Sequence, residues 1–229
     1  MRSIQRRRQS EGESRALILD AATGLFAEKG YAATKVQEIV GRAGVTKPVL
    51  YYYFRNKEGL FQAIWDRAER LQEQVLDEVS AAPGTAMDRF ELFCERVYEK
   101  LAEYPDLFRF IHHVAMAQPS GTPRRDIKGP RRKAVEVLSG ICREGVKRGE
   151  LEGGTPGDMA MMVLAIIDFC IHHDFLYPES ADRERPVRML RLAFEGLKPA
   201  KGGSIRSRIP KQRGMETEAT NSYSGKNKR

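Results

Sequence analysis

The sequence has no long apolar run and few cysteines. Its longest apolar run, 159–167, is well short of the roughly 20 residues that a membrane-spanning helix needs. The basic N-terminus lacks the apolar segment of a secretory signal. The three cysteines (Cys94, Cys142 and Cys170) are far apart, so that neither a disulfide framework nor a zinc-binding pair is indicated. These absences predict a cytoplasmic protein with no membrane partner.

Signatures of common enzyme classes are also missing. The chain has no GxSxG, Walker A, GxGxxG or HExxH pattern, and its scattered carboxylates suit solvated helix faces. We therefore predict that the protein is not an enzyme, with no catalytic residues, no cofactor and no metal. The alternative is a helical domain that binds or transforms a small molecule. A DNA-binding assay would distinguish such a domain from a regulator.

Strand patterns are absent, and helical periodicity runs through the chain instead. We predict an all-α fold, with helices at about 14–31, 34–43, 46–54, 57–80, 85–103, 105–118, 129–148, 156–177 and 185–197. Residues 198–229 contain almost no large apolar side chains, so we expect a basic disordered tail there.

The first helices are separated by recognisable cap and turn residues. Thr34 and Gln37 have the spacing of a capping box, and Gly44 suits a tight turn. Thr46 can cap a third helix and Asn56 a fourth, long one. Two short helices joined by a glycine-containing turn predict a helix-turn-helix.

The positive charge is concentrated in a few segments. The net charge is +8, of which residues 1–15 carry +3 and residues 198–229 carry +7, so that the body of the chain is at −2. Within the body, 34–57 holds five cations and one anion. This local excess indicates an anionic partner at one place and argues against a non-specific nucleic-acid binder.

Three consecutive tyrosines lie in the second short helix. Leu50 and Phe54 have the spacing of a buried face, whereas Tyr51, Tyr52 and Tyr53 point to other sides. In a helix-turn-helix the second helix enters the DNA major groove, where one face reads bases and the edges touch phosphates. Aromatic hydroxyls beside cations suit that position.

The segment "TKVQEIVGRAGVTKPVLYYYFRNKEGLFQAI" resembles the DNA-binding signature of the tetracycline-repressor (TetR) family of transcription regulators. The resemblance covers about residues 14–65. It is carried by ten positions: Thr34, Ile39, Ala43, Gly44, Val45, Leu50, Tyr51, Phe54, Lys57 and Leu60. Position 53, often His in such sequences, is Tyr here.

The resemblance implies a homodimer of about nine helices per subunit. It implies a basic arm (1–13), a DNA-binding domain of three helices (14–57), a ligand-binding and dimerisation domain (58–197) and the basic tail (198–229). Its implied function is that of a repressor released from a palindromic operator in double-stranded DNA by a small-molecule effector.

Residue roles follow position by position. The resemblance implies DNA phosphate contacts at Thr34, Thr46, Tyr51 and Lys57. It implies base contacts at Lys47, Pro48, Val49, Tyr52 and Tyr53.

The second domain is interpreted from its apolar residues. The helix at 156–177 is apolar nearly all round and the last helix has one apolar stripe, so we expect a four-helix dimer contact. Interface candidates are Val163, Ile167, Val187, Leu190 and Phe194. Candidates for the ligand pocket are Phe90, Phe93, Val97, Phe108, Ile111, His112, Met116, Leu138, Cys142, Met162 and Ile166.

Some features allow several interpretations. Asp168 and His172 share a helix face that one of His112 or His113 can join, either as a metal site, as a buried hydrogen-bonded group or as plain surface. The cysteines can be inert or oxidant-sensing. Residues 6–8, "RRR", can form an arm that lies in the DNA minor groove.

Overall fold

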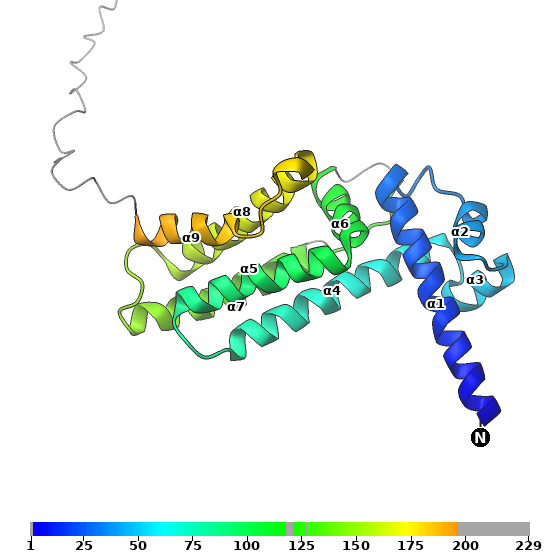
Figure 1. Cartoon of the computed structure of the whole chain (residues 1–229), viewed down its shortest axis with the longest axis horizontal. Helices are drawn as coiled ribbons and strands as arrows, with labels where there is room; N and C mark the ends of the chain where they lie inside the picture. The colour runs from blue at the N-terminus through cyan, green and yellow to red at the C-terminus, as the bar shows by residue number, and fades with distance from the viewer. Residues whose placement is uncertain (1, 118–120, 127, 197–229) are drawn as a thin grey trace, which may run out of the picture. The chain divides into compact units, whose positions relative to one another are not determined.

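The structure, a computed structural model, describes residues 2–117, 121–126 and 128–196, with side chains from residue 12 onward except those of Met116 and Ala117. The described residues form nine α-helices and one short 3₁₀ helix, without a strand (Figure 1). The helices are α1 (Arg2–Lys29), α2 (Val36–Ala43), α3 (Lys47–Phe54), α4 (Lys57–Ala81), α5 (Ala86–Glu103), α6 (Pro105–Ala117), α7 (Lys128–Lys147), α8 (Pro156–Leu176), η1 (Pro178–Ser180) and α9 (Arg185–Glu195). The predicted all-α fold is confirmed.

The first helix starts earlier than the sequence indicated. α1 already begins at Arg2, in the segment expected to be a basic arm, and ends where Gly30 adopts a φ of 83°. Whether that segment contacts DNA stays a prediction. The predicted tail, 198–229, lies outside the described residues.

Polar side chains cap the start of three later helices, α4, α5 and α8. Asn56 accepts a hydrogen bond from the Gly59 N–H at 2.7 Å and so caps α4, as predicted. Thr85 and Thr155 cap α5 and α8 in the same way. The cap of α2 is one residue later than predicted: Lys35 is the N-cap, and Glu38 accepts from its N–H at 2.7 Å.

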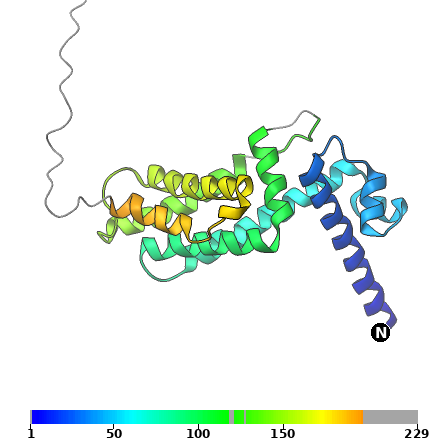
Figure 2. The same cartoon turned by 45° about the horizontal axis from the view of Figure 1, so that its top comes forward.

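A first core cluster joins the three N-terminal helices to α4 and α6. Its buried residues are Ile18, Leu19, Ala21, Ala22, Leu25, Phe26, Ile39, Val40, Ala43, Leu50, Phe54, Leu60, Phe61, Ile64, Trp65, Leu107, Phe110 and Val114. Phe110 of α6 is 5.3 Å from Phe61 and 6.3 Å from Trp65, ring centre to ring centre. Figures 1 and 2 both show α6 beside α1. The core of the helix-turn-helix unit thus includes a helix from far along the chain.

A second core cluster joins the end of α4 to α5, α7, α8 and α9. Its larger members are Val75, Leu76, Val79, Phe90, Phe93, Cys94, Tyr98, Leu138, Ile141, Cys142, Met159, Val163, Leu164, Ile167, Cys170, Ile171 and Leu190. α4 contributes side chains to both clusters and therefore links them.

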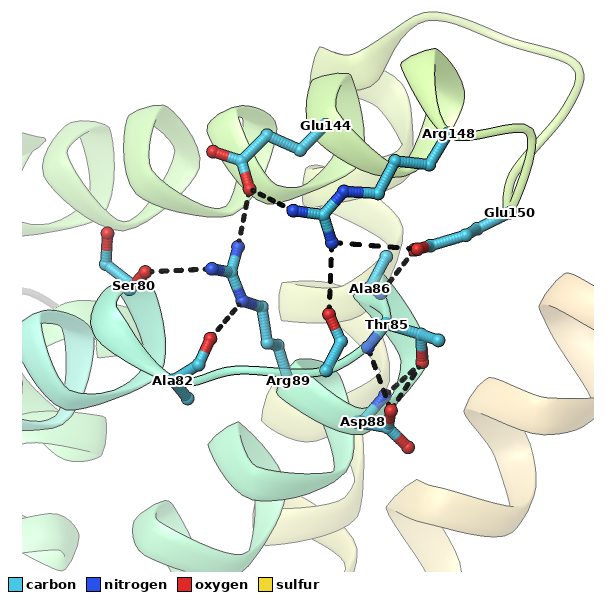
Figure 3. Close-up of polar contacts among 10 residues, drawn as sticks. Ser80, Ala82, Thr85, Ala86, Asp88, Arg89, Glu144, Arg148 and Glu150 are labelled. Atoms are coloured by element: carbon cyan, nitrogen blue, oxygen red, sulfur yellow. Dashed lines mark hydrogen bonds and ion pairs between the residues drawn. The ribbon is translucent and has the colours of Figure 1, made fainter.

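The turn between α4 and α5 is fastened to α7 by charged side chains (Figure 3). Arg89 donates hydrogen bonds to the carbonyl oxygens of Ser80 and Ala82. The same guanidinium reaches the Glu144 carboxylate of α7 at 2.8 Å. Arg148, directly after the end of α7, lies 4.0 Å from Glu144. These contacts hold the end of α4 that is remote from α3.

One helix among the described residues, α8, is long and apolar enough to cross a membrane by length and composition alone. Forty-four per cent of the most apolar 18-residue stretch of this helix is buried inside the protein. Core helices of soluble proteins pass the same test, so one such helix is weak support for a membrane span.

Candidate DNA-binding site

The helix-turn-helix is built as the sequence indicates. α2 ends at Gly44, whose φ of 66° lies in the left-handed region that glycine adopts without strain. Leu50 and Phe54 anchor α3 in the first core cluster. Tyr51 is 44% exposed and Tyr52 is 74% exposed, so that both phenols are available on the outer side of α3.

The candidate base-reading residues of α3 differ in exposure, and two of them pack against the first core cluster. Lys47 and Pro48 are exposed at the start of α3, whereas Val49 and Tyr53 are half-buried. The rings of Tyr52 and Tyr53 meet edge to face, with centroids 5.0 Å apart. This contact limits the movement of the Tyr52 side chain. A Tyr52 ring held in one orientation is better suited to contact a particular base edge than a mobile one.

Unpaired cations surround the tyrosines. Among the described residues, Lys35, Lys47 and Arg55 are exposed and enter no ion pair. By contrast, Arg42 pairs with Glu28 at 2.6 Å, and Lys29 pairs with Glu38. The two pairs neutralise one part of the surface and leave Lys47 and Arg55, at the two ends of α3, and Lys35, at the start of α2, to attract an anion.

Lys35 and Arg55 were counted in the charge of this segment but were not among the predicted contacts. Arg55 is exposed directly after α3, and its φ of 58° is uncommon for a residue other than glycine. The excess of positive charge in residues 34–57 was the sequence feature that could have identified both residues as candidate DNA contacts.

Two of the predicted phosphate contacts remain on the surface. Tyr51 has its exposed phenol, and Thr46 is exposed at the N-cap of α3 without a side-chain capping bond. The first N–H groups of a helix have no partner within it and favour an anion, so the Thr46 hydroxyl lies beside donors suited to a phosphate.

Thr34 is not on the surface. Its side chain is 1% exposed, and its hydroxyl donates to the Gly30 carbonyl at 2.8 Å and the Leu25 carbonyl at 3.2 Å. The prediction of a side-chain phosphate contact at Thr34 is therefore wrong for this conformation, because the hydroxyl is already used inside the α1–α2 turn. Both the capping box and the phosphate contact had assumed an outward hydroxyl.

Lys57 also faces the protein. Its ammonium donates to the Tyr31 carbonyl oxygen at 2.7 Å and to the Thr34 carbonyl oxygen at 2.9 Å. It lies 4.1 Å from the centre of the Tyr31 ring. Burial lowers the pKa of this ammonium below its usual value. The predicted phosphate contact thus has a competing set of partners within the chain.

The candidate pocket residues are divided between the two cores. Phe90, Phe93, Leu138 and Cys142 are buried in the second core cluster, with Val97, Phe108 and Ile166 half-buried against it. Ile111 packs against the first core cluster instead. Met162 is half-buried, and the side chain of Met116 lies outside those described. The pocket therefore remains a prediction, and Ile111 is separated from the other apolar candidates.

A surface cavity of about 530 Å³ lies elsewhere, between α4, residues 124–126 and the start of α7. It is lined by charged and polar side chains, and none of the pocket candidates lines it. Arg125 at its edge donates to Gln62, Asp66 and Glu69, which lie along one side of α4, at 2.7–2.8 Å. This one guanidinium fastens the loop before α7 to α4.

Three of the candidate dimer contacts are buried within the subunit. Val163, Ile167 and Leu190 belong to the second core cluster, so their assignment to an interface is wrong. Val187 and Phe194 are half-buried against the same cluster, and Phe194 stacks on Phe90 with ring centres 5.3 Å apart. Periodicity showed that α8 is apolar nearly all round but not which side meets its own subunit.

Other apolar side chains of these helices are exposed. They are Met161, Phe169 and Leu176 on α8, Tyr177 directly after it, and Leu192 on α9. The three α8 residues are spaced by eight and seven positions, which places them along one helix face.

The histidine pairs meet partners on other elements. His112 Nε2 and His172 Nδ1 are 3.0 Å apart, which joins α6 to α8. Burial, followed by the neighbouring His172, lowers the pKa of His112. His173 lies 2.9 Å from a guanidinium nitrogen of Arg185. The described residues contain no group of three side chains able to hold a metal ion.

The cysteines are all buried in the second core cluster. Burial raises the thiol pKa of Cys94 to about 12 and that of Cys142 to about 11, and it also raises that of Cys170. Thiols kept protonated and covered react slowly with oxidants, which argues against the oxidant-sensing interpretation.

Taken together, a helix-turn-helix with an exposed aromatic and cationic second helix, inside an all-helical chain, defines a DNA-binding transcriptional regulator. The family model described as "Bacterial regulatory proteins, tetR family" matches residues 18–64. The chain is thus similar to the TetR family of regulators over its helix-turn-helix region.

Relatives agree with that assignment. The chain is 27% identical over 157 residues to the fatty acid metabolism regulator protein of Bacillus subtilis, covering 66% of this chain and 78% of that protein. It is 27% identical over 190 residues to the HTH-type transcriptional regulator TtgR of Pseudomonas putida, covering 78% and 88%. Among solved structures, the SmeT–triclosan complex is 26% identical with a TM-score of 0.66, covering 79% of this chain and 91% of that one. SmeT is the repressor of the Stenotrophomonas maltophilia multidrug efflux pump SmeDEF.

Proposed function

We propose that this protein is a cytoplasmic repressor that binds a palindromic operator as a homodimer and is released by a small-molecule effector. The observation that carries DNA recognition is the outer side of α3, where Tyr51 and Tyr52 are exposed between the unpaired cations Lys47 and Arg55. The protein acts by binding alone, without catalysis. Regulators of this family are typically not enzymes.

Base contacts and phosphate contacts differ in what their loss does. We propose that Tyr52 and Lys47 read bases, whereas Thr46 and Tyr51 hold phosphates and so fix the position of α3 on the duplex. Pro48 and Val49 line the same side, with Tyr53 supporting Tyr52. Base contacts carry the sequence preference and phosphate contacts do not.

The test is an electrophoretic shift with DNA upstream of the protein's own gene and a shuffled duplex of the same composition. Tyr52→Ala and Lys47→Ala are each expected to cost about 1–3 kcal/mol on the operator and much less on shuffled DNA. Lys147→Ala, which removes an exposed cation at the end of α7 and outside the helix-turn-helix, is the matched control for Lys47→Ala and should leave both affinities unchanged. Equal loss on both duplexes would mean that sequence is read elsewhere.

The dimer face is proposed to be the exposed apolar side of α8 and α9. Met161, Phe169, Leu176 and Leu192 are large apolar side chains that the subunit itself leaves in solvent. An isologous contact of two such faces forms a four-helix interface and holds two α3 helices at half-sites about 34–36 Å apart.

The dimer face can be tested by light scattering after gel filtration. Phe169→Asp and Leu192→Asp should give folded monomers, because both side chains are exposed in the subunit and buried only in the proposed contact. Val146→Asp, at an exposed apolar residue of α7, is the control and should remain dimeric. A folded, fully dimeric Phe169→Asp/Leu192→Asp protein would exclude this face.

The effector is proposed to be a hydrophobic small molecule that enters the second core cluster among α5, α7 and α8. Phe90 and Phe93 supply aromatic walls there, and the half-buried Val97, Phe108 and Ile166 can repack. The solved complex of the relative SmeT with triclosan supports this class of ligand. Since α4 belongs to both cores, a ligand that prefers a shifted α4 would lower operator affinity.

A further inference from the structure

Two imidazole rings, the histidine bridge, join α6 to α8. Nε2 of His112 lies 3.0 Å from Nδ1 of His172, and the rings are nearly parallel with centroids 4.8 Å apart. His112 also meets the Phe175 ring of α8 edge to face, at 5.9 Å. Figure 1 shows the C-terminal end of α8 beside α6, whereas α6 packs chiefly on α1. The link between α6 and α8 is therefore narrow, and the bridge is a large part of it.

The contact restricts the protons that the two rings can carry. A hydrogen bond between imidazole nitrogens needs one nitrogen with a hydrogen and one without. The bridge therefore holds when both rings are neutral or when one is protonated. A second proton would set two N–H groups against each other at 3.0 Å. Once α6 and α8 separate, each ring takes up its own proton, so in acid the separated state binds one proton more than the joined state.

The charged groups around the bridge do not compensate a second positive charge. Asp168 of α8 faces the bridge, but its carboxylate is paired with Arg131 of α7. On α6, Arg109 pairs with Asp106 at 3.6 Å and its guanidinium lies over the Phe175 ring. His113, the next residue of α6, adds a further ring that can become positive. The surroundings therefore favour a bridge with at most one proton.

The direction of the pH effect follows from His112. Burial, followed by the charge of His172, lowers the pKa of His112 below its ordinary value of 6.5. A lowered pKa means that the joined state prefers the neutral ring. The contribution of this ring to the joined state is complete above pH 6.5, and it weakens as the pH falls from 6.5 towards the lowered pKa.

The bridge connects the two regions that operator binding needs. Phe110 of α6 packs on Phe26 and Phe61 in the first core cluster, which holds α3. α8 carries Phe169 and Leu176 of the proposed dimer face. The angle at which α6 meets α8 thus contributes to the distance between the two α3 helices of a dimer, which must match half-sites one DNA turn apart.

We propose that the histidine bridge is a pH-sensitive switch: in mild acid, uptake of a second proton separates α6 from α8 and lowers operator affinity. The proposal rests on the proposed binding of a palindromic operator by a homodimer. Shuffled DNA has no pair of half-sites to match, so its binding should change little by this route. One extra proton shifts the equilibrium by about tenfold at most at one pH unit below the ordinary imidazole pKa.

The experiment titrates the full-length protein against operator and shuffled duplexes at about pH 7.5 and about pH 5.5 and constant ionic strength, on either side of the ordinary imidazole pKa. In the wild type, the ratio of operator to shuffled affinity should fall by about three- to tenfold in acid. In His112→Gln/His172→Asn, amides without a titrating group replace the two facing nitrogens, so the ratio should change by less than about twofold. His112→Gln alone should also lose the response.

The matched control is His113→Gln, which removes the exposed histidine next to the bridge and should keep the wild-type response. NMR follows the protonation directly, because the chain has only four histidines. His112 should titrate at a lower pH in the wild type than in His172→Asn, which lacks the neighbouring charge. Equal titration in the two proteins would show that the rings are not coupled and would overturn the proposal.

The binding data can contradict the proposal in three further ways. The wild type and the double variant can respond alike to acid, or His113→Gln can lose the response; either result would assign the effect to other groups. Light scattering should show dimers at both pH values, and dissociation of the wild type in acid would place the sensitive step at the dimer face instead. A wild type that does not distinguish the operator at neutral pH would refute the proposed function, while the NMR titrations would still test the bridge.

Discussion

The two core clusters hold their helices by different means. In the first core cluster, rings of Phe26, Phe61, Trp65 and Phe110 meet one another across α1, α4 and α6. In the second core cluster, a buried carboxylate, Asp174, takes part in holding the helices together. An interlocked aromatic core favours one arrangement, which suits a recognition helix that must keep its position.

The polar part of the second core joins three helices. The Tyr98 hydroxyl of α5 donates to the Asp174 carboxylate of α8 at 2.8 Å. Arg185 of α9 donates to the other carboxylate oxygen at 2.7 Å and to the Ser180 carbonyl. A buried and satisfied network of this kind holds α5, α8 and α9 in one arrangement. Repacking around an effector therefore depends on the half-buried aliphatic side chains of this core.

The largest expected effect tests whether α6 belongs to the first core. Phe110→Ala should lower the free energy of unfolding by about 3–5 kcal/mol, because the ring is buried among Phe26, Phe61 and Trp65. Phe108→Ala, two positions away and only half-buried against the second core, should cost clearly less. Urea denaturation measures both. Equal costs would show that the two cores are not separate at α6.

Effector binding should stabilise the protein through the second core. At a hundredfold excess over Kd, a ligand that binds only the folded state adds about 2.7 kcal/mol. A thermal-shift screen of hydrophobic compounds is expected to find such a stabiliser, and Phe93→Ala should abolish its shift. Phe26→Ala, in the first core, is the comparison: its melting temperature falls, but the ligand-induced increase should persist. A shift retained in Phe93→Ala would place the ligand elsewhere.

The polar network should contribute less than the aromatic core. Tyr98→Phe removes one donor to the buried Asp174 carboxylate and should cost about 1–3 kcal/mol at neutral pH. Burial, followed by the hydrogen bond to Asp174, raises the pKa of Tyr98 above its ordinary value of 10.0. The neutral phenol therefore stabilises the fold below pH 10, and this contribution falls as the pH rises above 10. The stability difference between wild type and Tyr98→Phe should shrink in alkaline denaturation series, and a constant difference would contradict the assignment.

The smallest expected effect belongs to the surface of α3. Tyr51→Phe should weaken operator and shuffled DNA alike by about 1 kcal/mol, since it removes one neutral hydroxyl bond to phosphate. The salt slope should hardly change, and the free energy of unfolding should stay the same because the phenol is exposed. A loss confined to the operator would instead make Tyr51 a base-reading residue.

The sequence predicted the local features of the first core well. Helix spacing, the cap at Asn56 and the turn at Gly44 depend on residues close together in the chain. The inward hydroxyl of Thr34 and the carbonyl partners of Lys57 were missed because these contacts are made at the α1–α2 turn, and helical periodicity does not predict contacts made at a turn.

In the second core, sequence patterns predicted the helices but not which of their apolar residues are buried. The helices of this region begin and end close to their predicted positions, but the exposed side of α8 did not follow from its composition. An apolar residue such as Val163 and one such as Phe169 look alike in the sequence, and only the packing of α5, α7 and α9 makes one buried and the other exposed. For the same reason, the sequence could not show that Ile111 packs against the first core cluster while most of the other apolar pocket candidates pack in the second.

The place of α6 in the first core bears on how such regulators are recombined, in nature or by gene fusion. An exchange of the N-terminal segment at the end of α3 would separate Phe26 and Leu50 from Leu107, Phe110 and the rest of α6. The hybrid would then join two halves of a core that had not been selected together. Chimeras that carry α6 along with the N-terminal helices, or that start from parents with matching α6 side chains, should express as soluble protein more often than those cut at the motif boundary.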